Sequence, residues 1–268
     1  MGGRGGSMGG SHGMGGGGSA GGAAKTAAPA APQTREQQLL AQIKGNPAAL
    51  MQMSDQDALD TVKAIEQQSV ATDGTERDCW TQRYLNLLGW NSTKPQVLDE
   101  KAYEAARKNA KTESMYHAVK DSPKANAAVL QQQYLTGATA YTSEGYYGAG
   151  TYWAHGSAVG SSMYGNRQIK CFLNKRAKVI STGELDNMMG QFARSKPNTF
   201  AHLLGVSSGY GTRDETLYTL LAASHGYNTI VKGRSRKITR GDYVITLDRS
   251  TTTVASTIKN CNSITNNW

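Results

Sequence analysis

The feature that most constrains this chain is a change in its sequence pattern near residue 112. From 34 to 111, apolar residues recur at the three- and four-residue spacing of amphipathic helices. From 112 to 256 the pattern becomes short β-rich segments broken by Gly, Asn and Ser, and Ile169, Cys171 and Leu173 alternate there with polar residues. The chain therefore divides into a helical region and a later region that contains most of the strands.

The helical region is expected to hold four helices. The first contains Leu39, Leu40 and Ile43 and ends before Gly-Asn-Pro at 45–47, and the second begins at Ser54, where Ser and Asp three residues apart resemble a cap. The other two helices of this region are expected at 75–88 and at 99–108. Two more are expected in the later region, one after Ser181 or Thr182 and one from Thr212 to a stop at Gly226. Further strands are expected at 227–231 and around Tyr243, Ile245 and Leu247.

Four segments follow from these patterns. Residues 1–33 are rich in Gly, Ala, Ser, Met and Pro and carry few charges, so they bury too little surface to offset the entropy of ordering. We expect a disordered Gly-rich tail there, and a basic arm that touches a partner is the alternative. The others are a helical N-terminal region at 34–111, one catalytic-sized domain at 112–256 and a polar C-terminal tail at 257–268.

The charge balance favours acidic partners. There are 29 Lys and Arg residues against 20 Asp and Glu, and the net charge of +9 attracts phosphates, nucleic acid or acidic protein surfaces. The basic residues are not interleaved with aromatic ones, so we expect no sequence-specific nucleic-acid binding.

The cysteines and the apolar segments indicate the compartment. Cys79, Cys171 and Cys261 are odd in number and far apart, which predicts neither a disulfide framework nor a metal site. The first residues do not resemble a secretory signal, and no stretch approaches about 20 apolar residues. We expect a cytoplasmic protein with no membrane partner. The cytoplasm of a host cell and a phage particle are the other settings considered.

One segment points to a ligand. Residues 144–154, EGYYGAGTYWA, place Tyr147, Gly148, Gly150 and Tyr152 together, and Ser161 and Tyr164 follow. Glycines let the backbone approach a flat ligand closely while aromatic rings stack on it, a combination that a plain hydrophobic core rarely needs. This pattern predicts a nucleotide or nicotinamide site.

Two further motifs flank that segment. The first is Met-Tyr-His-Ala at 115–118, and the second is GDYVITLD at 241–248, in which Asp242 opens an expected strand. The three motifs, in this order over about 112–250, resemble the ADP-ribosyltransferase superfamily. The resemblance is to its His-Tyr-acidic branch, which includes poly(ADP-ribose) polymerases and diphtheria-toxin-like enzymes.

The resemblance implies an α+β fold, a split antiparallel β core with flanking helices, and NAD as the substrate. It implies three catalytic residues, His117, Tyr152 and Asp242. Asp242 would stabilise the oxocarbenium-like state and hold the 2′-hydroxyl of the nicotinamide ribose, and His117 would bind the adenosine ribose. The residues implied to bind NAD are Tyr116, Ala118, Tyr147, Gly148, Gly150, Ser161 and Tyr164, with Tyr152 and Tyr164 on either side of the nicotinamide ring and Ser161 on its carboxamide.

The chain departs from the family pattern at two positions. Ala118 stands where Gly is usual, and Asp242 stands where Glu is usual, so the carboxylate is shorter by one methylene. Single transfer to a protein or another acceptor is therefore expected rather than polymer synthesis. The basic residues at 232–240, next to Asp242, are candidates to bind the NAD pyrophosphate or an acidic target.

Structural alternatives stay open at this point. Asp242 fits a turn after Gly241, and Glu184 or Glu215 are other candidate acids. His117 and the tyrosines fit an ordinary core. The alternative for the whole chain is a catalytically inactive structural or binding protein that retains the fold, such as a phage or bacterial particle component.

Overall fold

The computed structural model describes residues 32–68, 79–90, 93–119, 150–155, 167–206 and 213–260. Within these ranges a single mixed, mostly antiparallel sheet is flanked by helices, so the expected α+β fold is confirmed.

The N-terminal helices begin where capping side chains stand. They are α1 (Arg35–Ile43), α2 (Ala49–Gln52), α3 (Asp55–Glu66) and α4 (Trp80–Leu87). The side chains of Thr34 and Ser54 accept hydrogen bonds from the backbone N–H groups of Gln37 and Asp57, which would otherwise lack partners in the first helical turn. The predicted start of α3 and the predicted end of α1 before residue 45 are thus confirmed, while the single turn α2 was not predicted.

The sheet is assembled from segments spread over the whole described chain. Its strands are β1 (Gln96–Leu98), β2 (Met115–Val119), β3 (Thr151–His155), β4 (Arg167–Leu173), β5 (Val179–Ser181), β6 (Thr229–Val231), β7 (Tyr243–Thr246), β8 (Thr252–Ala255) and β9 (Lys259–Asn260). The order among the described residues is β1-β8-β4-β2-β3-β7-β6-β5, and β9 pairs with β4. Only the end pairs, β1 with β8 and β5 with β6, are parallel among the described strands.

Four further helices connect the described strands. α5 (Glu100–Arg107) lies between β1 and β2, and α7 (Thr182–Ser195), α8 (Pro197–Gly205) and α9 (Arg213–Ser224) lie between β5 and β6, while the 3-10 turn η3 (Arg249–Thr251) precedes β8. Ser181 caps α7 in a capping box with Glu184, as its sequence indicates. Two helices were expected between β5 and β6. α8 was missed, although Pro197 in its first turn is a helix-start signal.

The N-terminal helices are joined to α8 by a side-chain cap. The Asp55 carboxylate accepts hydrogen bonds from the backbone N–H groups of Asn198 and Thr199 and from the Thr199 hydroxyl, at 2.8–3.0 Å. Burial acts to raise the pKa of Asp55, but the bonds from Thr199 and Asn198 outweigh it and hold the pKa below its usual value. The Lys196 ammonium, itself buried, donates to the Met53 carbonyl.

Apolar side chains form two main cores on opposite faces of the sheet. The helix-side core packs α3, α4, α7 and α9 against β5, β6 and β7, through residues such as Val62, Trp80, Leu185, Leu220 and Ile245. The inner core lies on the other face and includes Met115, Trp153, Cys171, Val231, Val244 and Val254, so it draws on both halves of the sheet. A smaller cluster of Tyr103, Phe172 and Ala255 holds α5 against β4 and β8.

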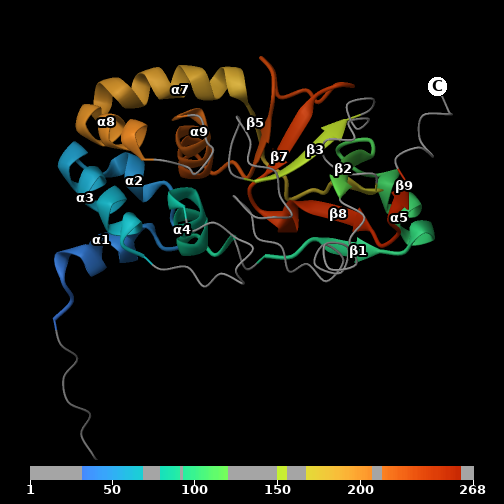
Figure 1. Ribbon diagram of the computed structural model, residues 1–268, viewed down its shortest axis with the longest axis horizontal. Helices are drawn as coiled ribbons and strands as arrows, with labels where there is room; N and C mark the ends of the chain where they lie inside the picture. Colours follow the sequence, from blue (N-terminus) through green and yellow to red (C-terminus); the bar gives the residue numbers. More distant parts are fainter. Residues whose placement is uncertain are drawn as a thin grey trace, which may run out of the picture. The chain divides into compact units, whose positions relative to one another are not determined.

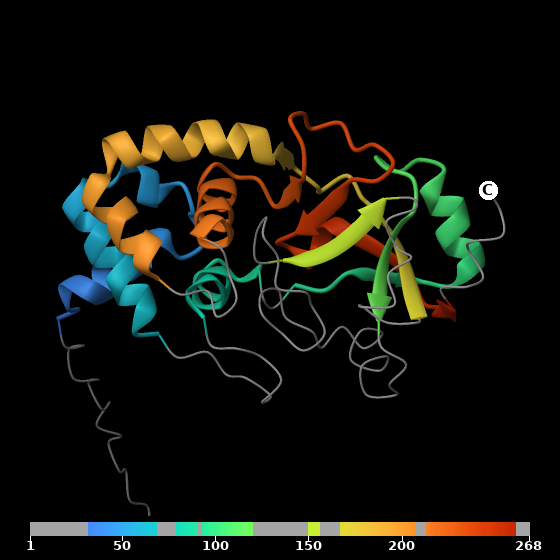
Figure 2. The same cartoon turned by 45° about the horizontal axis from the view of Figure 1, so that its top comes forward.

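The helical N-terminal region and the expected catalytic domain share the helix-side core. Trp80 and Tyr84 come from the first and Leu217 and Leu221 from the second, and residues from 33 onward form one compact unit. In Figures 1 and 2, α1–α4 and α7–α9 lie together beside the β5–β6–β7 part of the sheet, and α5 lies beside the β8–β1 part. The boundary expected after residue 111 therefore does not separate two cores.

The sheet parts in its middle, between β2 and β3. Their ladder has only two described pairs, Met115 with His155 and Tyr116 with Ala154. Beyond it, β2 continues beside β4 as far as Val119, and β3 continues beside β7 back to Thr151. Figure 2 shows the two strands running in clearly different directions. The residues at which they separate are His117 and Ala118 on β2 and Tyr152 and Trp153 on β3.

Within the described ranges, no helix combines the length and the apolar character needed to cross a bilayer.

Candidate functional site

The three sequence motifs lie on three neighbouring strands. His117 is on β2, Tyr152 is on β3, and Asp242 directly precedes β7, and these strands are adjacent in the order β2-β3-β7. In the sequence, 34 residues lie between His117 and Tyr152, and 89 lie between Tyr152 and Asp242. The pairing of the strands therefore brings the motifs onto neighbouring strands. Tyr147, Gly148, Ser161 and Tyr164 lie outside the described residues.

His117 bridges the two strands where their ladder has ended. Its Nδ1 lies 2.7 Å from the carbonyl oxygen of Tyr152, and its ring packs edge-on against the Trp153 ring with centroids 5.6 Å apart. A carbonyl only accepts, so Nδ1 donates the hydrogen, and the neutral imidazole then keeps its lone pair on Nε2. The side chain is 8% exposed. A hydrogen bond from a side chain thus replaces the backbone ladder at the start of the separation.

Tyr152 contributes its backbone, rather than its ring, to this contact. Successive residues of a strand point to opposite faces. Trp153 belongs to the inner core with Val244, while the Tyr152 ring packs against the helix-side core with its partner Ile245. The role of the Tyr152 ring in stacking on nicotinamide stays a prediction.

Asp242 stands at a bulge at the entry of β7. Gly241 N–H donates to the His155 carbonyl at 2.6 Å, and His155 N–H donates to the Asp242 carbonyl at 2.9 Å, so two residues face one. Gly241 has φ +94°, and Asp242 N–H closes a turn onto the Thr239 carbonyl at 3.1 Å. A glycine with positive φ at this point is the signature of a G1 bulge after a type II turn. Such bulges redirect the side chain that follows them.

The Asp242 carboxylate also bonds within its own turn. Its Oδ2 accepts from the Thr239 backbone N–H at 2.6 Å and from the Thr239 hydroxyl at 2.8 Å. The turn interpretation left open for Asp242 is therefore part of the structure, and it fixes one of the two carboxylate oxygens. Because Asp242 precedes Val244 by two residues, its side chain projects to the same face as Val244 and its cross-strand neighbour Trp153. His117 contacts Trp153 on that face.

The loop before Asp242, residues 232–241, is held on the N-terminal end of α7. Gly183 N–H donates to the Gly233 carbonyl at 2.9 Å, and the Thr182 hydroxyl exchanges hydrogen bonds with the Gly233 backbone. Arg236 binds both carboxylate oxygens of Glu184 at 2.8 and 3.0 Å and donates to the Tyr227 hydroxyl at 2.9 Å. These contacts fix the path of the chain into the bulge.

The Glu184 carboxylate binds Arg236 and thereby holds the 232–241 loop on α7. The pKa of Glu184 is lowered to about 2, chiefly by the Arg236 guanidinium and also by the Ser181 hydrogen bonds, although partial burial acts to raise it. Of the two alternative acids, Glu184 is thus an anchoring residue for the loop. The side chain of Glu215 lies outside those that the structure describes.

Gly150 is required by the sheet itself. A Cβ at this position would stand 2.6 Å from the Thr246 carbonyl oxygen and 2.7 Å from Ile245 Cγ2. The space beside Gly150 is therefore occupied by the backbone of β7, and its predicted approach to a flat ligand stays a prediction.

Tyr116 and Ala118 flank His117 on β2. Tyr116 pairs with Lys170 and Ala154 in the ladders, and burial raises the pKa of its hydroxyl. Ala118 pairs with Gln168 of β4 and lies beyond the last described pair with β3.

Two polar residues near the site were missed by the sequence analysis. His155 lies opposite the Gly241–Asp242 bulge, is 8% exposed, and its Nδ1 has no hydrogen-bond partner. Gln168 is 2% exposed, and neither of its amide atoms has a partner. The period-two pattern of β3 puts His155 on the face of Trp153, a signal that the sequence already carried.

The described residues also limit other chemistry. In the ranges listed above, no three His, Cys, Asp or Glu side chains gather where they could hold a metal ion. Burial raises the pKa of the Cys171 thiol well above its usual value, which disfavours the reactive thiolate.

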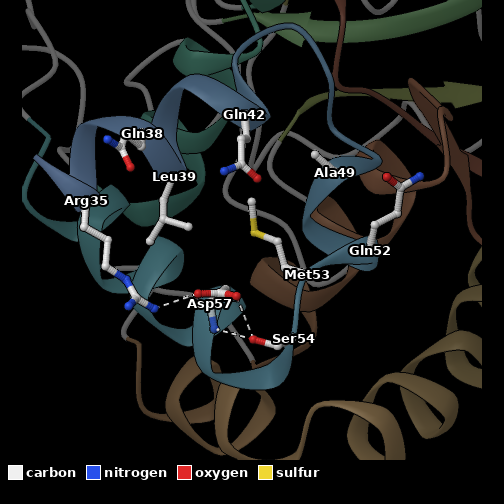
Figure 3. Close-up of a pocket in the computed structure, with 9 residues that line it drawn as sticks. All are labelled: Arg35, Gln38, Leu39, Gln42, Ala49, Gln52, Met53, Ser54 and Asp57. Carbon is white, nitrogen blue, oxygen red and sulfur yellow. Dashed lines mark hydrogen bonds and ion pairs between the residues drawn. The ribbon is translucent and has the colours of Figure 1, made fainter. Parts of the chain in front are cut away.

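A separate pocket of about 620 Å³ lies among α1, α2 and α3, lined by Arg35, Gln38, Gln42 and Asp57 among others. Figure 3 shows Asp57 bound there to Arg35 and Ser54. The pocket contains none of the candidate site residues.

A scan against protein-family models matches no family, and searches of curated proteins and of solved structures find no significant match. Only this chain's own residues and geometry bear on its function.

Proposed function

We propose that this protein is an NAD-dependent mono-ADP-ribosyltransferase, which releases nicotinamide from NAD and transfers ADP-ribose to a protein or another acceptor. The proposed catalytic residues are His117, Tyr152 and Asp242. The remaining residues that the resemblance implies for NAD binding keep their proposed roles.

The observation that carries the proposal is the separation of β2 from β3 at the first two motifs. A ligand can bind main-chain N–H and C=O groups only where these groups are not hydrogen-bonded to a neighbouring strand. The described pairing of β2 with β3 ends at Tyr116. His117 and the Tyr152 carbonyl stand at that point, 2.7 Å apart. Asp242 enters the same face from β7, the strand next to β3. Two of the three motifs thus meet where the strands separate, and Asp242 lies on the same face, opposite His155 at the end of β3 that still pairs with β2.

The bulge suits Asp242 to stabilise positive charge. Cleavage of the bond between nicotinamide and ribose passes through an oxocarbenium-like state, and a fixed carboxylate stabilises it without reorganising during the reaction. Thr239 holds Oδ2 through two hydrogen bonds, so the carboxylate is preorganised. The bulge redirects the side chain and thereby addresses the shorter reach of Asp compared with Glu.

His117 is suited to bind a hydroxyl. The bond from Nδ1 to the Tyr152 carbonyl selects the tautomer whose Nε2 is an acceptor. In the proposal, Nε2 accepts a hydrogen bond from the adenosine ribose, and His117 takes no part in proton transfer. The role of Tyr152 then includes its carbonyl, which orients the imidazole.

The basic loop fits an anionic substrate. Arg234 and Lys237 are exposed on the loop that leads into Asp242, while Arg236 is committed to Glu184. The proposal assigns the exposed charges to the NAD pyrophosphate or to an acidic region of the acceptor.

Binding of NAD is tested by thermal stabilisation and by labelling. NAD at about 100 times its dissociation constant adds about 2.7 kcal/mol to the free energy of unfolding. His117→Ala should abolish most of the shift and should also abolish transfer of label from adenine-labelled NAD to lysate proteins. His225→Ala is the matched control, because His225 Nδ1 also bonds a backbone carbonyl, that of Leu221, at the far end of α9. If NAD does not stabilise the chain and no label is transferred from NAD to lysate proteins, the alternative holds, and the chain is an inactive structural or binding protein.

A further inference from the structure

Trp153 is held in one orientation by a hydrogen bond to the neighbouring strand. Its indole Nε1 donates to the Thr246 hydroxyl of β7 at 3.0 Å, and the two side chains are 1% and 0% exposed. The indole belongs to the apolar inner core with Met115, Ile169 and Val244. A buried indole N–H needs an acceptor, so the position of the Thr246 hydroxyl decides which way the ring faces.

The Thr246 hydroxyl is itself held in place. It donates to the Thr151 carbonyl at 3.4 Å while it accepts from Trp153, and the first bond points the hydroxyl hydrogen away from the indole. A buried hydroxyl costs free energy unless it is hydrogen-bonded, so packing alone favours valine at this position. What threonine supplies here, and valine does not, is the acceptor for the indole.

The Trp153 ring in turn limits the imidazole of His117. The two rings meet edge-on, with centroids 5.6 Å apart and planes at 62°, a favoured geometry for aromatic pairs. The bond from Nδ1 to the Tyr152 carbonyl fixes one corner of the imidazole, but a single hydrogen bond lets a ring turn about it. The indole at the side of the imidazole opposes that rotation. The two contacts together therefore set the direction of Nε2.

We propose that Thr246 is a positioning residue for NAD binding: its hydroxyl orients the indole of Trp153, which orients the imidazole of His117 toward the adenosine ribose. The inference rests on the proposed transferase function and adds to it a residue that does not touch NAD. Thr246 acts through Trp153 and His117, because its own side chain is fully buried.

The first arm of the test observes the imidazole of His117 by NMR of the full chain without NAD, with His117→Gln to identify its signals. In the wild type, the ring-nitrogen signals should show a protonated Nδ1 and an unprotonated Nε2, and the ring current of the indole should displace the ring-proton signals. Thr246→Val should reduce this displacement and bring the two nitrogen signals closer together, because a freed indole lets the imidazole turn away from the Tyr152 carbonyl. Thr246→Ser keeps the hydroxyl and should restore the wild-type spectrum.

Thr253→Val is the matched control. Thr253 is also a threonine of the sheet, on β8, and it is 1% exposed. Its hydroxyl also bonds a side chain, that of Gln96, at 3.2 Å. Its replacement should lower the free energy of unfolding to a similar extent and leave the His117 signals unchanged. A change in the His117 signals that both variants share would show a general loosening of the sheet and would overturn the inference.

The second arm measures nicotinamide release from NAD. Because His117 binds a ribose hydroxyl in the proposal and transfers no proton, Thr246→Val should raise the KM for NAD and leave kcat within about twofold of the wild type. The rise should be about 2- to 10-fold, the effect of one neutral hydrogen bond. An unchanged His117 spectrum in folded Thr246→Val overturns the inference, as does a fall in kcat at constant KM. If the wild type releases no nicotinamide, the proposed function fails, and the spectra, recorded without NAD, still decide whether Thr246 orients His117.

Discussion

His117 Nδ1 lies 2.7 Å from the Tyr152 carbonyl, at the position where β2 and β3 cease to pair. The hydrogen bond crosses from one strand to the other and thereby sets the tautomer of the imidazole. It also marks where the sheet separates, which is where two of the three sequence motifs meet. The third motif reaches the same face through the bulge at Gly241 and Asp242.

Gly241→Ala should impair activity through backbone strain alone. Gly241 has φ +94°, and an added Cβ would meet nothing within 4 Å. A non-glycine residue in left-handed conformation costs about 1–2 kcal/mol, so the turn should relax and Asp242 should shift. A displacement of about 1 Å costs on the order of 10²-fold in rate. Chemical denaturation and nicotinamide release measure the two effects.

Gly89→Ala is the matched control for this strain. Gly89 follows α4, has φ +74° and also has open space around the added Cβ. It should lose a similar free energy of unfolding and keep the wild-type rate. Equal loss of activity in both variants would show that the bulge has no special relation to catalysis.

Gly150→Ala should destabilise the sheet by a different mechanism. The added Cβ would stand 2.6 Å from the Thr246 carbonyl oxygen, which is backbone and cannot move aside cheaply. Overpacking of this kind costs about 1–3 kcal/mol, and the midpoint of denaturation should fall accordingly. Gly205→Ala, at the end of α8 with nothing within 4 Å, should be neutral or slightly stabilising. A fully stable Gly150→Ala would contradict the close packing of β3 on β7.

The sequence predicts the elements of this chain better than their arrangement. Thr34, Ser54 and Ser181 sit at helix starts because capping is a local interaction, and the alternation of β4 is equally local. α8 was missed because its apolar residues pack on α3 and α9 in a way that a short window does not reveal. The shared helix-side core and the end of the β2–β3 ladder depend on contacts between distant segments, which composition and spacing do not encode.

The residues of the candidate site stay a prediction, and their arrangement required the structure. His117 and Tyr152 lie on adjacent strands and Asp242 directly precedes the next one, an adjacency that the motif order alone does not give. The orientation of the Tyr152 ring toward the helix-side core and the role of Gly150 in the sheet also required the structure. His155, the last residue of β3, was missed because the bulge that faces it is formed by a distant segment of the chain, although the alternation of β3 already placed it on the face of Trp153.

Gln168→Leu should stabilise the protein. Gln168 is 2% exposed and both amide atoms lack partners, so an apolar side chain of similar size removes an unsatisfied polar group. The gain should be about 1 kcal/mol or more by chemical denaturation. Gln42→Leu, at an exposed position of α1, should stay within about 0.5 kcal/mol of the wild type. A clear loss of stability in Gln168→Leu would mean that its amide is satisfied in solution.

Glu184→Gln should reveal a pH-dependent anchor of the basic loop. Arg236 lowers the pKa of Glu184 from 4.5 to about 2, so the ionised carboxylate stabilises the folded state. This contribution is fully present above about pH 4.5, and it is lost as the pH falls toward 2. Glutamine keeps the capping box but loses the charge. Because both partners are substantially exposed, the wild-type advantage at pH 7 should be at most about 1 kcal/mol.

That difference is followed by thermal melts of both proteins between pH 2 and 7. The two melting curves should converge near pH 2. A gap that stays constant across this range would show that the ion pair does not form in solution.

The central claim is tested most directly by the release of nicotinamide from NAD by the purified chain, with Asp242→Asn and Asp248→Asn beside it. Asp248 lies at the other end of β7, where its carboxylate caps η3 at Ser250, a role that Asn can retain. The account predicts release by the wild type and by Asp248→Asn, and a loss of about 10²-fold or more in Asp242→Asn. Release that Asp242→Asn leaves intact, or no release by the wild type, would contradict it.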